Sequence, residues 1–92
     1  MQYAIYGLDK PNGLDVRKAN RDAHVAHLRR HLDNIVVAGP LLSDDGATMI
    51  GSLIVVDFAE KAQLDAFLTD DPYAKAALFQ SVAVRPWKKV LP

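Results

Sequence analysis

Six segments of this 92-residue chain carry the pattern of a regular element, and their order strongly restricts the fold. Short runs of strand-forming residues, bounded by glycine, proline, asparagine or aspartate, indicate strands. Longer stretches that lack glycine and proline and carry apolar residues at helical spacing indicate helices. The expected strands cover 3–8, 35–42, 48–58 and 79–84, and the expected helices cover 14–32 and 60–69, with a short helical turn at 71–77. The order β-α-β-β-α-β predicts one α+β domain over residues 1–92 with a ferredoxin-like, split βαβ arrangement.

Turn and breaker residues refine this prediction. Pro40 lies inside the second strand, which places that strand at a sheet edge or at a bulge. The Asp45-Gly46 pair favours a tight hairpin between the second and third strands. Asn34 is expected to end the first helix, and Pro86 is expected to stop the last strand.

The strands are apolar on both faces, which predicts an assembly. In the first strand Tyr3 and Ile5 lie on one face, whereas Tyr6 and Leu8 lie on the other. The third strand likewise has apolar residues at alternate positions on both faces. An antiparallel sheet with one face in water would alternate apolar and polar residues, and two helices cover only one face. We therefore expect a homodimer, or a higher even oligomer, that packs sheet to sheet.

Composition excludes several other classes. The formal net charge is zero, which argues against a nucleic acid or an anionic membrane as partner. There is no cysteine, so the chain has no disulfide, no thiolate metal site and no cysteine nucleophile. No apolar stretch approaches the roughly 20 residues of a membrane span, and the start has no signal-peptide pattern. We expect a cytoplasmic protein.

The first helix carries polar residues where an amphipathic helix would place its apolar face. The apolar residues of that face are Leu14, Val25, Leu28 and Leu32. Arg21 falls in the middle of this stripe, with Arg17 and His24 at its edge, whereas His27 and His31 turn towards solvent. A buried arginine needs a partner, so Arg21 should reach water or meet a carboxylate or an anionic ligand.

Each of these polar residues also has an ordinary structural interpretation. His24 could be an interfacial side chain at the rim of an apolar face. The i, i+4 pair His27 and His31 has the spacing of a helical metal site, but the sequence offers no evident further ligand. Asp71 before Pro72 is a good helix N-cap, which alone would explain that residue.

Two further features add to the candidate site. Tyr73 can pack its ring while presenting its hydroxyl to a pocket. Gly51-Ser52 indicates a close approach of the backbone near the start of the third strand.

Several motifs along the whole chain match one known family in order. The matching segments are Tyr3-Ala4-Ile5-Tyr6, Arg17, Arg21-x-x-His24-x-x-His27-Leu28, Ala38-Gly39-Pro40, Gly51-Ser52, Asp71-Pro72-Tyr73 and Arg85-Pro86-Trp87-Lys88-Lys89-Val90. In these segments the chain resembles the YciI-like (YCII-related) family of the dimeric α/β-barrel superfamily. The resemblance implies a ferredoxin-like protomer, a sheet-to-sheet dimer and a cleft between helices and sheet.

The resemblance also implies roles for particular residues. His24 and Asp71 correspond to the catalytic histidine–aspartate pair proposed for the family. Arg17, Arg21, Ser52 and Tyr73 are expected to line the same pocket and to bind substrate. The short connection between Pro40 and Gly51 is expected to reshape the pocket mouth.

A histidine held by a carboxylate can act as a general acid or base. With an arginine that holds an anion, it suits isomerisation, elimination or hydrolysis of a small cyclic or anionic molecule. Such an enzyme would need no cofactor and no metal. The alternative is a non-catalytic dimer that binds a small metabolite and needs the arginines but not the proton-transfer pair. A third alternative is an assembly protein whose polar residues are structural.

Overall fold

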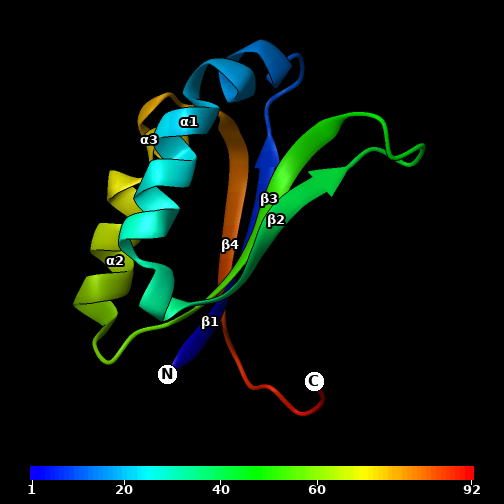
Figure 1. The fold of residues 1–92 in the computed structure, drawn as a ribbon. Helices are drawn as coiled ribbons and strands as arrows, with labels where there is room; N and C mark the ends of the chain where they lie inside the picture. Colours follow the sequence, from blue (N-terminus) through cyan, green and yellow to red (C-terminus); the bar gives the residue numbers. More distant parts are fainter.

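The computed structural model describes residues 1–92 and has the predicted order of elements (Figure 1). The elements are β1 (Gln2–Asp9), α1 (Leu14–Arg30), the 3-10 turn η1 (Leu32–Asn34), β2 (Ile35–Leu42), β3 (Met49–Asp57), α2 (Lys61–Asp70), α3 (Pro72–Lys75) and β4 (Phe79–Trp87). The four strands form one antiparallel sheet in the order β2-β3-β1-β4. Figure 1 shows the helices on one face of this sheet. The ferredoxin-like prediction is therefore confirmed.

The two strand prolines both lie on edge strands. Pro40 belongs to β2, at one edge of the sheet, as its position in the sequence predicts. The expectation that Pro86 stops the last strand is wrong, because β4 continues to Trp87 with Pro86 opposite Tyr3. β4 forms the other edge, and an edge strand tolerates proline because only one of its sides donates to a neighbouring strand.

The hydrophobic core lies between the sheet and α2. Its fully buried members are Ile5, Ile54, Val56, Phe58, Leu64 and Phe67. Ile5 and Ile54 are direct cross-strand partners, so β1 and β3 present them side by side towards the helices. α2 begins with a reciprocal capping box in which the Glu60 side chain accepts from the backbone of Gln63, and the Gln63 side chain accepts from the Glu60 N–H.

α1 packs through a polar face instead. Its three fully buried side chains are Arg17, His24 and His27. The prediction that His27 turns towards solvent is wrong, since this side chain is only 1% exposed. The reason is the end of the helix: α1 stops at Arg30, so Leu32 lies in η1 outside the helical repeat and does not define a buried face.

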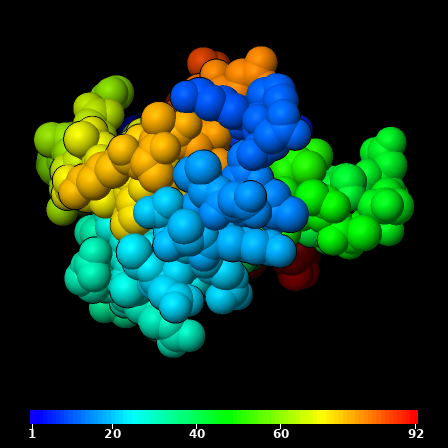
Figure 2. Space-filling view, turned by 90° about the horizontal axis from the view of Figure 1, so that it is seen from above, coloured from blue at the N-terminus to red at the C-terminus, as the bar shows by residue number.

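The opposite face of the sheet is open and apolar. Tyr6, Val37 and Leu53 lie there as large exposed side chains, with Tyr6 directly opposite Leu53. The pattern of two apolar sheet faces is thus present in the fold. The hairpin between β2 and β3 projects from the body beside α1, in green in Figure 2. None of the helices is long and apolar enough to cross a membrane.

Candidate active site

A cavity of about 210 Å³ with polar and apolar walls lies between α1 and the strands β2 and β3. Its polar walls come from Arg17, Arg21, His24, Ser52 and Tyr73. Its apolar walls include Val25, Leu28, Pro40, Met49 and Ile54. Five of the six residues predicted for the site therefore line one cavity. The sixth, Asp71, lies outside this lining and contacts His24.

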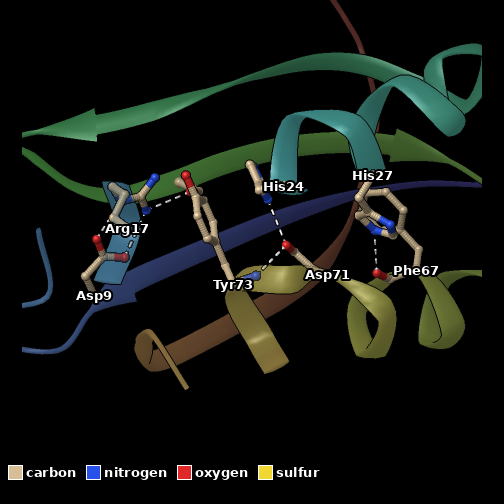
Figure 3. Close-up of polar contacts among 8 residues, drawn as sticks. Asp9, Arg17, His24, His27, Phe67, Asp71 and Tyr73 are labelled. Carbon is tan, nitrogen blue, oxygen red and sulfur yellow. Dashed lines mark hydrogen bonds and ion pairs between the residues drawn. The ribbon is translucent and has the colours of Figure 1, made fainter. Parts of the chain in front are cut away.

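His24 and Asp71 form a buried hydrogen bond of 2.7 Å between Nδ1 and Oδ1 (Figure 3). A carboxylate can only accept, so the Nδ1–H of His24 donates and Nε2 is the remaining nitrogen. The same Oδ1 accepts a 2.9 Å hydrogen bond from the backbone N–H of Tyr73 and thereby caps α3. The cap and the contact with His24 coexist, because the cap fixes where the carboxylate lies. The structure brings the two residues together; their catalytic role stays a prediction.

The Tyr73 ring fixes the plane of the His24 ring. The two rings stack with centroids 3.9 Å apart and planes 12° apart. His24 lines the cavity, and Nε2 makes no hydrogen bond to the protein, so this nitrogen is open to a ligand. Burial raises the pKa of the Tyr73 phenol, and the nearby Arg17 charge opposes this only in part. The hydroxyl therefore stays protonated at neutral pH and can donate a hydrogen bond.

Arg17 is a buried cation with a fixed orientation. Nε lies 2.7 Å from one oxygen of Asp9, and Nη2 lies 2.9 Å from the other. Nη2 also donates to Ser52 Oγ at 2.9 Å, and the guanidinium lies 4.7 Å from the centroid of the Tyr73 ring. Burial disfavours the charge, but the hydrogen bonds and charge of Asp9 outweigh it and raise the pKa of Arg17 above its ordinary value. Figure 3 draws the Tyr73 ring between Arg17 and His24.

Of the outcomes expected for Arg21, the structure shows the first, because the side chain reaches water. It forms no ion pair with a carboxylate of the chain. Arg21 nevertheless lines the cavity and lies close enough to Tyr73 to act on its ionisation. The cavity wall thus contains two arginines. Asp9 neutralises the charge of Arg17, whereas no acidic side chain pairs with Arg21.

His27 lies outside the cavity and packs against α2. Its Nε2 lies 3.0 Å from the carbonyl oxygen of Phe67, and its ring stacks on the Phe67 ring at 4.8 Å. Burial lowers the pKa of His27, although the hydrogen bond to the Phe67 carbonyl opposes this shift. His31 approaches with a ring distance of 5.0 Å, but no third ligand-type side chain joins the pair. The contacts of His27 are those of a core residue.

Asp9 is a site residue that the sequence analysis did not single out. Asp9 sits at the end of β1, next to an irregularity in the pairing with β4. The sequence could have indicated such a residue only through the requirement that a buried arginine has a carboxylate partner. That requirement does not say which of the eleven acidic residues supplies it.

Comparison with solved structures defines the class. The chain superposes on 5-chloro-2-hydroxyhydroquinone dehydrochlorinase (TftG) from Burkholderia phenoliruptrix AC1100, solved in complex with 2,5-dihydroxybenzoquinone, with a TM-score of 0.88. The identity is 35%, and the match covers 96% of this chain and 94% of that one. A crystal structure of an antibiotic biosynthesis monooxygenase matches with a TM-score of 0.60 at 14% identity, over 99% of this chain and 100% of that one, and shows the fold alone. The fold of the chain is that of the dimeric α/β-barrel class.

Comparison with sequences defines the family. The model of the YCII-related domain matches residues 1–88. Protein YciI of Escherichia coli O6:H1 is 35% identical over 97 residues, covering 98% of this chain and 99% of that protein. An uncharacterized protein of Haemophilus influenzae is 33% identical, with the same coverage. The chain belongs to the YCII-related family.

Proposed function

We propose that this protein is a cofactor-independent enzyme that moves protons on a small hydroxylated ring, in an elimination or isomerisation reaction. One observation carries the proposal: Asp71 holds Nδ1 of His24, while Nε2 of the same ring faces a cavity whose wall carries arginines. Proton transfer by a held imidazole needs no bound cofactor.

Each residue of the cavity has a part in this chemistry. His24 Nε2 removes a proton from the substrate, and the Asp71 carboxylate stabilises the imidazolium that forms. Arg17, which Asp9 and Ser52 hold in place, stabilises negative charge on a substrate oxygen without moving. Tyr73 donates a hydrogen bond to the same molecule, and Arg21 attracts an anion to the mouth. In an elimination, the leaving group departs with its electron pair, and His24 returns its proton to water.

Cavity size and the structural comparison support the substrate class. A cavity of roughly 150 Å³ holds benzene, so the about 210 Å³ found here suits one substituted six-membered ring. TftG, the dehydrochlorinase, was solved with 2,5-dihydroxybenzoquinone, a ring with acidic hydroxyl groups. Such a ring, once ionised, fits a site that contains Arg17 and Arg21. We therefore include quinols and hydroxyquinones in the proposed substrate class.

The proposal includes a homodimer packed through the open sheet face. Tyr6, Val37 and Leu53 would otherwise leave an apolar surface in water, and the fold class supports this assembly. Sedimentation at micromolar concentration should show a dimer. Leu53→Lys should dissociate it, because a charge would be buried without a partner. Val16→Lys, at an exposed position of α1, is the matched control and should leave the dimer intact.

Turnover of a chlorinated hydroxyhydroquinone tests the activity. Chloride release and the absorbance of the quinone product are followed for the protein, His24→Gln and the control His31→Gln, since His31 does not line the cavity. We expect His24→Gln to lose about 100-fold or more and His31→Gln to retain activity. Tight binding of 2,5-dihydroxybenzoquinone without turnover of any quinol would instead support a non-catalytic metabolite-binding protein.

A further inference from the structure

A second cavity of about 290 Å³ lies beside the first, between the segment α2–α3 and the strands β1 and β4. Its apolar walls are Ile5, Ile54, Phe67, Leu68, Phe79 and Val82. Ser52 and Ile54 of β3 belong to both cavities, so they form part of the wall between them. Val82 is 47% exposed, which leaves the second cavity accessible from solvent along β4.

Asp71 lines this second cavity and not the first. Both hydrogen bonds of Asp71, from His24 Nδ1 and from the Tyr73 backbone, end on Oδ1. Oδ2 accepts no hydrogen bond from the protein, although Asp71 is only 6% exposed. No fully buried polar side-chain atom lacks a partner, so Oδ2 must border open space. The second cavity is the open space that Asp71 borders.

We infer that this cavity binds a second small molecule: a neutral, largely apolar ring or chain with one hydroxyl group, which donates a hydrogen bond to Asp71 Oδ2. The apolar walls favour a neutral body, and a carboxylate acceptor selects a donor. An anion would face the Asp71 charge with no basic residue in the lining to neutralise it. The first cavity contains two arginines and therefore favours an anionic ligand. Because the other oxygen of the same carboxylate holds His24, occupancy of the second cavity also acts on the proposed active site.

Phenol, anisole and benzoate are suitable probes, because all three carry a benzene ring but only phenol is a neutral donor. Each is titrated into the isotope-labelled protein, and chemical shifts are followed by NMR. We expect phenol to shift the resonances of Ala74 and Val82, which line only the second cavity. We expect phenol to bind about tenfold more tightly than anisole, which lacks the O–H, and more tightly than benzoate. Equal binding of phenol and anisole would overturn the assignment of the hydroxyl to Asp71.

Variants locate the binding site. Val82→Phe fills the cavity from its open side, and Ala74→Leu fills it from α3. If one variant folds poorly, the other still tests whether phenol binds in this cavity. Both should weaken phenol binding at least tenfold, whereas Val16→Phe, at an exposed position outside both cavities, should not. Shifts confined to Val25 and Leu28, which line only the first cavity, would overturn the proposal, as would no binding at millimolar phenol.

This inference stands apart from the proposed function. His24→Gln should abolish quinol turnover and leave phenol binding in place, so a protein without turnover still gives a clear result for the second cavity. Conversely, full turnover without phenol binding would refute the proposed second binding site and support the proposed active site.

Discussion

The imidazole of His24 lies face to face with the phenol ring of Tyr73, at a centroid distance of 3.9 Å. The stack sets the plane of the imidazole, and the hydrogen bond to Asp71 sets its rotation within that plane. Only Nε2 then remains to meet a ligand. Asp71 is the N-cap of α3 and Tyr73 follows two residues later, so one short segment, the start of α3, controls both constraints.

Asp71→Asn should separate the cap of α3 from the charge that His24 contacts. Asparagine caps about as well as aspartate, so the free energy of unfolding should change by less than about 0.5 kcal/mol. Turnover should fall by about 100-fold, because the imidazolium formed in the reaction loses its counter-charge. Denaturant unfolding and turnover of the same samples check both parts. Asp71→Ala is the matched variant and should also lose about 1 kcal/mol of capping. Unchanged turnover in Asp71→Asn would make Asp71 a structural residue.

Asp9→Ala should destabilise the protein strongly, because it leaves the Arg17 charge buried without a partner. We expect a loss of about 3–5 kcal/mol in the free energy of unfolding. Asp15→Ala, in the exposed first turn of α1, should cost less than about 1 kcal/mol. The double variant Asp9→Ala with Arg17→Met should be more stable than Asp9→Ala alone, since it removes the uncompensated charge. A double variant that is less stable than Asp9→Ala would contradict this account of the pair.

Arg21→Gln should weaken the binding of an anionic ring and leave the fold unchanged. Arg21 has no ion pair to lose, so the free energy of unfolding should stay within about 0.5 kcal/mol. The Kd for 2,5-dihydroxybenzoquinone, measured by calorimetry, should rise about 3- to 10-fold at low salt and less at high salt, because the charge is exposed. Arg29→Gln, exposed on the same helix but outside the cavity, should leave the Kd unchanged. An equal effect of both substitutions would indicate general attraction of anions only.

His27 should make the protein less stable in mild acid. Its pKa is lowered in the folded state, so the unfolded chain takes up a proton first, near the ordinary value of 6.5. The free energy of unfolding should therefore fall as the pH drops below about 6.5, by at most about 1.4 kcal/mol per pH unit for this one group. Denaturant unfolding between pH 7.5 and 5 measures the slope. His27→Gln should reduce the slope, whereas His31→Gln should not; equal slopes in all three proteins would exclude His27 as the cause.

The order of elements and the two apolar sheet faces are predictable from sequence because they rest on periodicity. The faces of α1 are harder to predict. Arg21 was placed in an apolar stripe that includes Leu32, but the helix ends at Arg30, and the buried face turns to Arg17, His24 and His27. A helix that docks through charged and aromatic partners on other elements gives no apolar periodicity to follow. For the same reason Asp9 could not be paired with Arg17 before the fold placed the end of β1 beside α1.

The polar attachment of α1 links ligand binding to the integrity of the helix. Arg17 and His24 hold α1 to the rest of the molecule and also line the proposed active site. A ligand that engages both residues would bind only while α1 is docked, and by mass action it would raise the midpoint of thermal unfolding. Thermal-shift screening of small-molecule collections thus reads out occupancy of this cavity without any assumption about the reaction. The true substrate can then be sought by the stability it confers rather than by the product it yields.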